Sequence, residues 1–181
     1  MSPASPVTRY HLVLVTLHWL LAVLICIALG MGMFSLSATP NSSPAKVDAL
    51  KGHMVAGITI LLLMTVRLVV RAVTAHPPPA QTGMAWADRL GPLAHGALYL
   101  GVFAMAGSGI AMAVGAGLPQ IVFQGVGQLP ADFHHLPARA VHGLVASLLV
   151  LLIVLHVAAA LYHQWVRRDH LLARMGFGPR R

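Results

Sequence analysis

Four long apolar runs, separated by short polar and proline-containing segments, dominate this chain of 181 residues. The runs cover about 12–34, 52–73, 93–114 and 138–165. Each is close to the roughly 20 residues that an α-helix needs to cross a bilayer. The first run is too long for the roughly 7–15 apolar residues of a cleaved signal peptide. The pattern therefore predicts an all-α, integral membrane four-helix bundle that forms a single domain over residues 1–181.

Composition agrees with a membrane protein, because 57% of the residues are hydrophobic, only 9% are charged and the mean hydropathy is +0.78. The net charge of +8 does not predict a nucleic-acid partner, since the basic residues are divided unevenly between the ends of the expected helices. Lys46, Lys51 and Arg139 fall at one end, and the other end carries Arg9, Arg67, Arg71, Arg89, Arg167, Arg168, Arg174, Arg180 and Arg181. The positive-inside rule then predicts N-in/C-in topology, with the basic end facing anionic lipid headgroups.

The fourth run carries two histidines, His142 and His156, with the uncharged segment GLVASLLVLLIVL between them. They are 14 residues apart, which corresponds to about 21 Å of helix and a rotation that returns to within about 40° of the same face. An imidazole inside a bilayer is costly unless it has a partner. The two residues are therefore candidates for ligands, one in each leaflet.

Alternating helix directions sort the histidines by depth. The first helix runs outward and the second and fourth run inward, so His18 and His156 share the inner leaflet and His53 and His142 share the outer. Two facing pairs suit two haem b groups with bis-histidine ligation. Zinc is disfavoured, because a closed site wants about four ligands. Four unrelated interfacial histidines are the alternative, and His95 lies at a depth where it can replace an inner ligand.

Other residues have two interpretations. Arg67 lies at the inner end of the second run, where it is either a snorkelling anchor or a partner of a haem propionate or quinone headgroup. His11 is shallow enough to be an interface residue, and the sequence does not settle whether it has a redox role.

Cys26 is the only cysteine, so neither a disulfide nor a thiolate cage is expected. Hydrolytic and phosphoryl-transfer motifs are absent from the sequence.

The same segments resemble the prokaryotic cytochrome b561 family of membrane cytochromes over essentially the whole chain. The matching stretches are RYHLVLVTLHWL, KGHMVAGITILLLMTVRLVVR, LAHGALYLGVFAMAGSGI and VHGLVASLLVLLIVLHVAAALYHQWVRRDHLLARM. The resemblance implies that the axial ligands of two haem b groups are His18, His53, His142 and His156. It also places His163 where some members have a histidine implicated in quinone binding, although Gln164 stands where relatives often have a second histidine.

The resemblance further implies an oxidoreductase of a bacterial inner membrane. We expect transmembrane electron transfer from superoxide, or another one-electron donor, at the outer face to ubiquinone in the membrane, with His163 and Arg67 at the quinone site. Because superoxide is an anion, Lys46, Lys51 and Arg139 are candidates for steering it electrostatically. Ordinary solvated loop charges are the alternative for these three residues.

Two other functions stay open at this point. In one, a quinol-oxidising cytochrome b passes electrons to or from a protein partner, such as a hydrogenase-like or periplasmic redox protein. In the other, a histidine-rich transporter moves a metal, although the spans lack the carboxylates that usually bind divalent cations.

Overall fold

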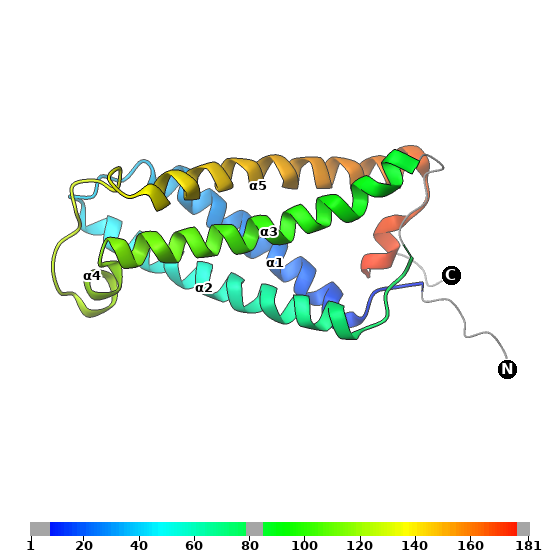
Figure 1. Cartoon of the computed structure of the whole chain (residues 1–181), viewed down its shortest axis with the longest axis horizontal. Coiled ribbons are helices and arrows are strands. Elements are labelled where there is room, and N and C mark those ends of the chain that lie inside the picture. The colour runs from blue at the N-terminus through cyan, green and yellow to red at the C-terminus, as the bar shows by residue number, and fades with distance from the viewer. Residues whose placement is uncertain (1–7, 79–84, 177–181) are drawn as a thin grey trace.

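Four long helices run side by side along the molecule in a computed structural model that describes residues 8–78 and 85–176 (Figure 1). They are α1 (Leu12–Gly30), α2 (Pro44–Val73), α3 (Ala85–Gly115) and α5 (Pro137–Tyr162). A short helix, α4 (Leu118–Gln124), lies in the connection between α3 and α5. All four long helices are long and apolar enough to cross a membrane. The expected all-α architecture with four apolar spans is therefore confirmed.

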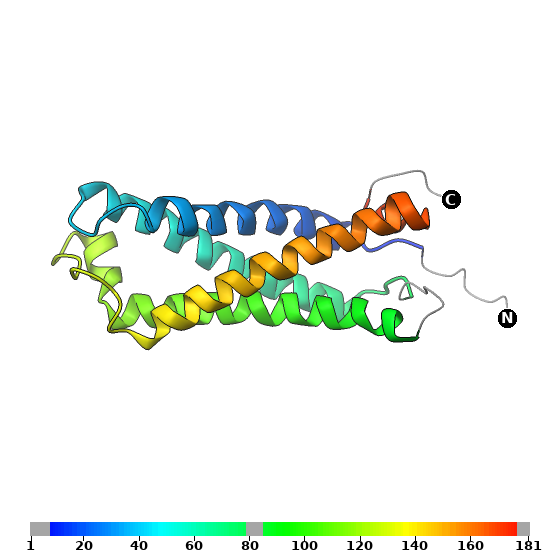
Figure 2. The same ribbon diagram turned by 90° about the horizontal axis from the view of Figure 1, so that it is seen from above.

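The bundle has two distinct ends (Figures 1 and 2). One, here called the termini end, contains the start of α1, the end of α2, the start of α3 and the end of α5. The opposite end, here called the α4 end, contains α4 and the connection from α1 to α2. At the α4 end α1 continues into a π-helical turn, Met31–Leu36. At the termini end α5 continues into a second π-helical turn, His163–Arg167, followed by a 3₁₀ turn, Leu171–Met175.

Two helices begin earlier than the sequence predicted. The second apolar run was expected to begin at about residue 52, but α2 begins at Pro44, directly after the extended residue Ser43. Proline suits this first-turn position, where its missing N–H has no intrahelical role. The third helix was expected to begin near Pro92, but α3 begins at Ala85 and holds Pro92 inside it. A proline inside a membrane helix is tolerated where neighbouring structure compensates the lost hydrogen bond.

A buried apolar cluster fills the middle of the bundle, here called the septum. Its members come from all four long helices: Leu21, Ile60, Met64, Val102 and Leu149. Leu149 is only 2% exposed, and it lies seven residues from both His142 and His156. Gly101 allows this packing, since a Cβ at that position would lie 2.7 Å from Leu149 Cδ2. This buried cluster therefore lies between the two levels at which the histidines lie.

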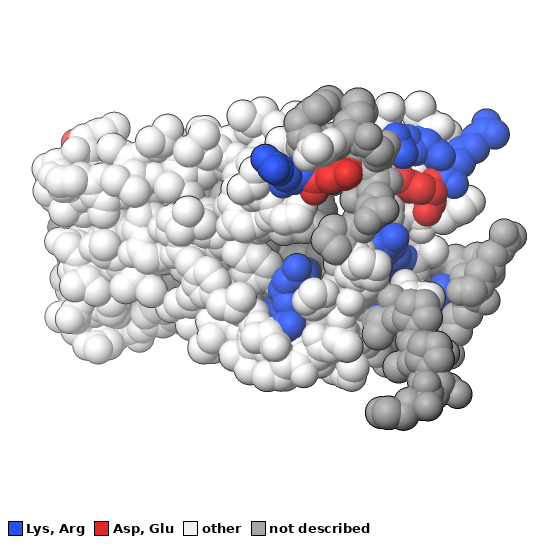
Figure 3. Space-filling view, turned by 45° about the vertical axis from the view of Figure 1, so that its right-hand side comes forward, with Lys and Arg blue, Asp and Glu red and all other residues white. Residues whose placement is uncertain are grey.

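The outer surface of the bundle is apolar, with exposed side chains such as Leu20, Leu62, Leu100 and Leu155 on the long helices. Such a surface matches a hydrocarbon environment. Lys and Arg side chains instead gather at the termini end, which faces forward in Figure 3.

Candidate functional site: two levels of paired histidines

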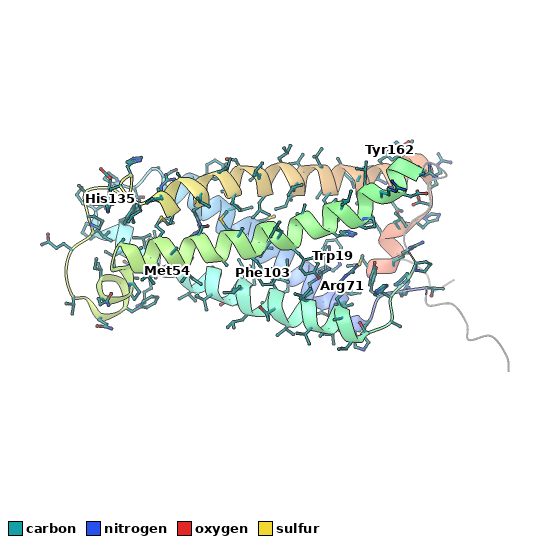
Figure 4. All side chains as sticks on the ribbon, in the orientation of Figure 1. Trp19, Met54, Arg71, Phe103, His135 and Tyr162 are labelled. Atoms are coloured by element: carbon teal, nitrogen blue, oxygen red, sulfur yellow. The ribbon has the colours of Figure 1, made fainter. Side chains whose placement is uncertain are left out.

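The structure brings the four sequence-predicted histidines together as two facing pairs. His18 of α1 and His156 of α5 have ring centroids 6.3 Å apart, with an angle of 68° between the ring planes. His53 of α2 and His142 of α5 have centroids 6.2 Å apart, with an angle of 77°. Figure 4 shows the separation in depth through two sequence neighbours: Trp19, beside His18, lies toward the termini end, and Met54, beside His53, toward the α4 end.

Both centroid distances fit a metal centre between the rings. Two imidazoles that bound one iron from opposite sides, with metal–nitrogen bonds of about 2 Å and ring radii of about 1.2 Å, would have centroids about 6.4 Å apart. Each ring can turn about its bond to the metal, so the large interplanar angles are compatible with this arrangement. The two pairs therefore have a spacing suited to a bis-histidine haem.

Helix packing leaves the paired histidines in a suitable place for a flat cofactor. Close backbone packing joins α1 to α2, α2 to α3 and, most extensively, α3 to α5. Among the described residues, the backbone of α5 does not pack closely against α1 or α2. Each histidine pair nevertheless joins a residue of α5 to a residue of one of these two helices. Leu149 is the only residue of α5 that is fully buried. Above and below the septum, α5 is thus separated from the helix that carries the facing histidine.

Ser108 fixes the orientation of His142 at the α4-end level. The Ser108 hydroxyl donates to the backbone oxygen of Met105, at 3.0 Å, and also lies 3.0 Å from His142 Nδ1. A hydroxyl has one hydrogen, so when Ser108 donates to Met105 it can only accept from an Nδ1–H of His142. This tautomer leaves the lone pair on Nε2, which is then the nitrogen available to a metal.

Close glycines also border this level. A Cβ on Gly109 would lie 3.2 Å from His142 Cε1, and one on Gly32 would lie 3.6 Å from His53 Cε1. The absence of side chains at these positions lets α3 and the end of the α1 span approach the two imidazoles. Gly109 and Gly32 therefore contribute to the space around the histidines of this level.

A third histidine lies at the termini-end level. The ring centroid of His95, from α3, is 5.5 Å from that of His156. This is shorter than the spacing expected across an iron, whereas His18 and His156 match that spacing. The geometry thus favours His18 over His95 as the partner of His156. His11 lies outside this group: its Nδ1 accepts a hydrogen bond from Val13 N at 3.3 Å and caps the start of α1.

Arg67 is half-buried beside the same level. One of its Nη atoms donates to the Tyr99 hydroxyl, and its Cζ lies 5.2 Å from the centroid of the Tyr99 ring. The guanidinium is also close enough to interact electrostatically with His18 and His156. A simple snorkelling anchor would extend into water, so the contact with Tyr99 favours the alternative in which Arg67 faces a ligand.

Three buried polar atoms have no hydrogen-bond partner among the described residues. They are His53 Nδ1, Arg67 Nε and Gln164 Oε1. Unsatisfied buried polar atoms are rare in folded proteins and call for an explanation such as a ligand. Each of the three belongs to a predicted site residue or, in the case of Gln164, to the neighbour of one. The unsatisfied atoms therefore coincide with the places where the sequence predicted a cofactor or a substrate.

His163 lies two turns beyond His156, toward the termini end. Its Nδ1 is 2.6 Å from Asp169 Oδ2, and the two side chains are 18% and 29% exposed. Arg167 Nε lies 3.6 Å from the same carboxylate oxygen. Sequence reasoning singled out His163 but missed Asp169, which lies in the turn after the helix, where no helical periodicity brings the two together.

The three predicted steering charges have different surroundings. Lys51 and Arg139 are exposed at the α4 end. Lys46 is not a loop residue as expected, because it lies in the first turn of α2 and is only 6% exposed. Its ammonium donates to the backbone oxygens of Leu36 and of Thr39, the latter at 2.8 Å. It therefore satisfies carbonyl groups that would otherwise be left at the end of the first span.

Zinc and other bare metal ions find no comparable site in the part of the chain that the structure describes. Among those residues, no group of three or more His, Cys, Asp or Glu side chains is placed to hold a metal ion. His134 and His135 lie in the connection from α4 to α5, and the backbone N–H of His134 donates to Asp132 at 2.8 Å. Facing pairs, rather than clusters, are thus the recurring arrangement.

An apolar four-helix bundle with histidines facing one another from different helices is an architecture that can hold a flat metal cofactor between its helices. Sequence comparison defines the class further, since the family model described as prokaryotic cytochrome b561 matches residues 9–178. The chain belongs to this family. Membership implies haem b and electron transfer in a membrane.

Individual relatives are similar over nearly their full length. The chain is 30% identical to cytochrome b561 homolog 2 of Escherichia coli (strain K12) over 182 residues, which covers 97% of this chain and 95% of the relative. It is 30% identical to cytochrome b562 of Cereibacter sphaeroides, covering 89% and 90%. It is 28% identical to a probable superoxide oxidase, CybB, of Yersinia pestis, covering 92% and 95%.

Proposed function

We propose that the protein carries electrons across a bacterial inner membrane through two haem b groups, oxidising superoxide at the α4 end and reducing ubiquinone near the termini end. The observation that carries this proposal is the pair of histidine levels, with centroid distances of 6.3 and 6.2 Å, on either side of the septum. Haem, when bound, supplies a one-electron carrier at each level. Two carriers are needed because the hydrocarbon core is about 30 Å thick.

The protein's own residues have distinct roles in this proposal. His53 and His142 hold one haem, and Ser108 keeps Nε2 of His142 directed to the iron. His18 and His156 hold the other. Between them Leu149 and the rest of the septum exclude water from the electron path. The path therefore runs along the inner face of α5.

Orientation follows from the distribution of charge. The termini end carries most of the arginines, so we assign it to the cytoplasmic side by the positive-inside rule. The α4 end then faces the periplasm, where Lys51 and Arg139 are exposed and can attract an anionic donor. The similarity to a probable superoxide oxidase of Yersinia pestis supports superoxide as that donor.

The quinone is assigned to the termini end for two reasons. His163 is two helical turns, or about 10 Å, from His156 on the same face of the helix, and it is only partly exposed. Arg67 offers an unsatisfied Nε at the same end of the bundle. A quinone oxygen gains negative charge as it is reduced, and a guanidinium or an imidazole N–H stabilises that charge.

The test is stopped-flow spectroscopy of the purified protein with its haem. A pulse of superoxide should reduce the haem, as seen in the α-band, and a short-chain ubiquinone should then reoxidise it. The proposal fails if superoxide leaves the haem oxidised, or if the reduced haem is not reoxidised by the quinone. Rapid haem reduction by a ubiquinol, combined with indifference to superoxide, would instead favour the quinol-oxidising alternative with a protein partner.

A further inference from the structure

His163 and Asp169 form a paired acid and base at the termini end. Their Nδ1 and Oδ2 atoms are 2.6 Å apart. The chain has four carboxylates, Asp48, Asp88, Asp132 and Asp169. Asp169 is one of these, and its carboxylate lies at hydrogen-bond distance from a histidine side chain.

The backbone around Asp169 is strained in a way that brings its carboxylate back to the helix. Arg168 and His170, on either side of it, both have left-handed backbones, with φ of 55° and 56°. Each such residue costs about 1 kcal/mol or more, because Cβ approaches the following carbonyl oxygen. They are the only non-glycine residues with positive φ in the described part of the chain. Strain of this kind persists where surrounding structure maintains it, and it is often found at functional sites.

The 3₁₀ turn that follows is anchored against the rest of the termini end. Trp19 Nε1 donates to Met175 O at 3.2 Å, and Tyr10 N donates to Arg174 O at 3.2 Å. Arg174 in turn donates to Pro78 O at 2.7 Å. These contacts join the C-terminal turn to the start of α1 and the segment after α2, so the position of Asp169 is determined by more than its own helix.

We propose that Asp169 is a positioning residue that makes His163 the proton donor for quinone reduction. The inference rests on the proposed function, since it assigns the proton path to the same quinone site. A carboxylate bound to Nδ1 keeps that nitrogen protonated and directs the proton exchanged during the reaction to Nε2. The basic residues nearest the pair in the chain are Arg167, whose Nε lies 3.6 Å from Asp169 Oδ2, and Arg168, with Arg174 on the next turn; the titratable His170 directly follows Asp169.

The chemistry balances as follows. Conversion of one ubiquinone to ubiquinol consumes two electrons and two protons. Two superoxide anions supply the electrons and become two molecules of dioxygen. For each proton, the N–H bond at Nε2 of protonated His163 breaks as an O–H bond forms on the quinone. His163 then regains a proton from the aqueous phase at the termini end, and Asp169 balances its positive charge while it is protonated.

The experiment compares Asp169→Asn with the wild type in the two phases of the stopped-flow assay, with haem content measured first. An asparagine is isosteric but can donate from its amide to Nδ1, which favours the wrong tautomer of His163. Reduction of the haem by superoxide should be unchanged. Reoxidation by a short-chain ubiquinone should slow by about 10- to 100-fold. This is less than the full rate enhancement of about 10²- to 10⁴-fold that a positioned acid usually gives, because His163 itself remains.

Two further variants separate proton transfer from a general structural effect. Asp169→Glu keeps the carboxylate and should restore most of the reoxidation rate, together with the wild-type solvent deuterium isotope effect on that phase. Asp88→Asn removes the same charge from the same end of the bundle, on α3, and should leave reoxidation within about twofold of wild type.

The outcomes distinguish this inference from the proposed function. A wild-type rate of reoxidation in Asp169→Asn, or an equal loss in the Asn and Glu variants, would overturn the role of Asp169 while leaving the electron path intact. A wild-type protein that is reduced by superoxide but is not reoxidised by quinone would overturn both.

Discussion

Removal of the Ser108 hydroxyl should weaken haem binding at one level of the bundle and leave the other unchanged. In the structure Ser108 Oγ lies 3.0 Å from His142 Nδ1, at hydrogen-bond distance in a partly buried position. A net hydrogen bond of this kind contributes about 0.5–1.5 kcal/mol. The backbone oxygen of Met105 remains near the imidazole as an alternative acceptor in Ser108→Ala. We therefore expect a loss of about 1 kcal/mol, or about a fivefold weaker affinity for haem at this level.

The assay is transfer of haem to excess apomyoglobin, followed in the Soret band. Two kinetic phases are expected for the wild type, one from each level. Ser108→Ala should accelerate one phase by about fivefold, and Ser108→Thr, which keeps a hydroxyl, should largely restore it. Ser147→Ala is the matched control, because Ser147 is an exposed residue of α5 whose hydroxyl donates to its own helix at Gly143 O. Equal rates for Ser108→Ala and Ser147→Ala, or acceleration of both phases, would refute the reasoning.

Three further predictions concern the septum and the charges at the α4 end. Gly101→Ala places a Cβ 2.7 Å from Leu149 Cδ2 and should lower the free energy of unfolding in detergent by about 1–3 kcal/mol. Gly96→Ala is the control and should not destabilise the protein, because no atom lies within 4 Å of the added Cβ. Equal stabilities of the two variants would contradict the packing of the septum. Simultaneous Lys51→Ala and Arg139→Ala substitutions should slow superoxide-dependent haem reduction by about threefold or more at low salt, and a full rate at low salt would remove their steering role. Lys46→Ala should mainly lower stability, by about 1–3 kcal/mol, because it leaves two backbone oxygens unpaired; an effect confined to the superoxide rate would contradict this.

The depth of each histidine in the membrane could be predicted from the sequence, because the rise per residue of an α-helix is nearly constant. The four spans were predicted from their length and hydropathy alone. The opposing directions of successive helices then placed His18 with His156 and His53 with His142, and in the structure the ring centroids of these pairs lie 6.3 and 6.2 Å apart. Whether each pair binds haem stays a prediction.

Features that depend on irregular backbone could not be predicted in the same way. Asp169 contacts His163 from a segment in which Arg168 and His170 take left-handed conformations that their side chains disfavour. Ser108 was missed because its contact with His142 depends on how α3 is rotated about its axis relative to α5. The periodicity of a nearly all-apolar helix does not fix this rotation. The position of Lys46 in a helix could have been predicted from Ser43-Pro44, which is a typical start of a helix. The nearby Pro40 and Asn41 instead suggested a loop.

The most direct test of the account is the number of haem b groups per chain, measured by the pyridine haemochrome method on the wild type and on substituted proteins. The account predicts two for the wild type, one for His53→Gln, one for His18→Gln and two for His95→Gln. The retained haem in each single variant should keep a low-spin spectrum with two histidine ligands. One haem in the wild type, or loss of a haem from His95→Gln with retention of both in His18→Gln, would contradict the paired-histidine assignment.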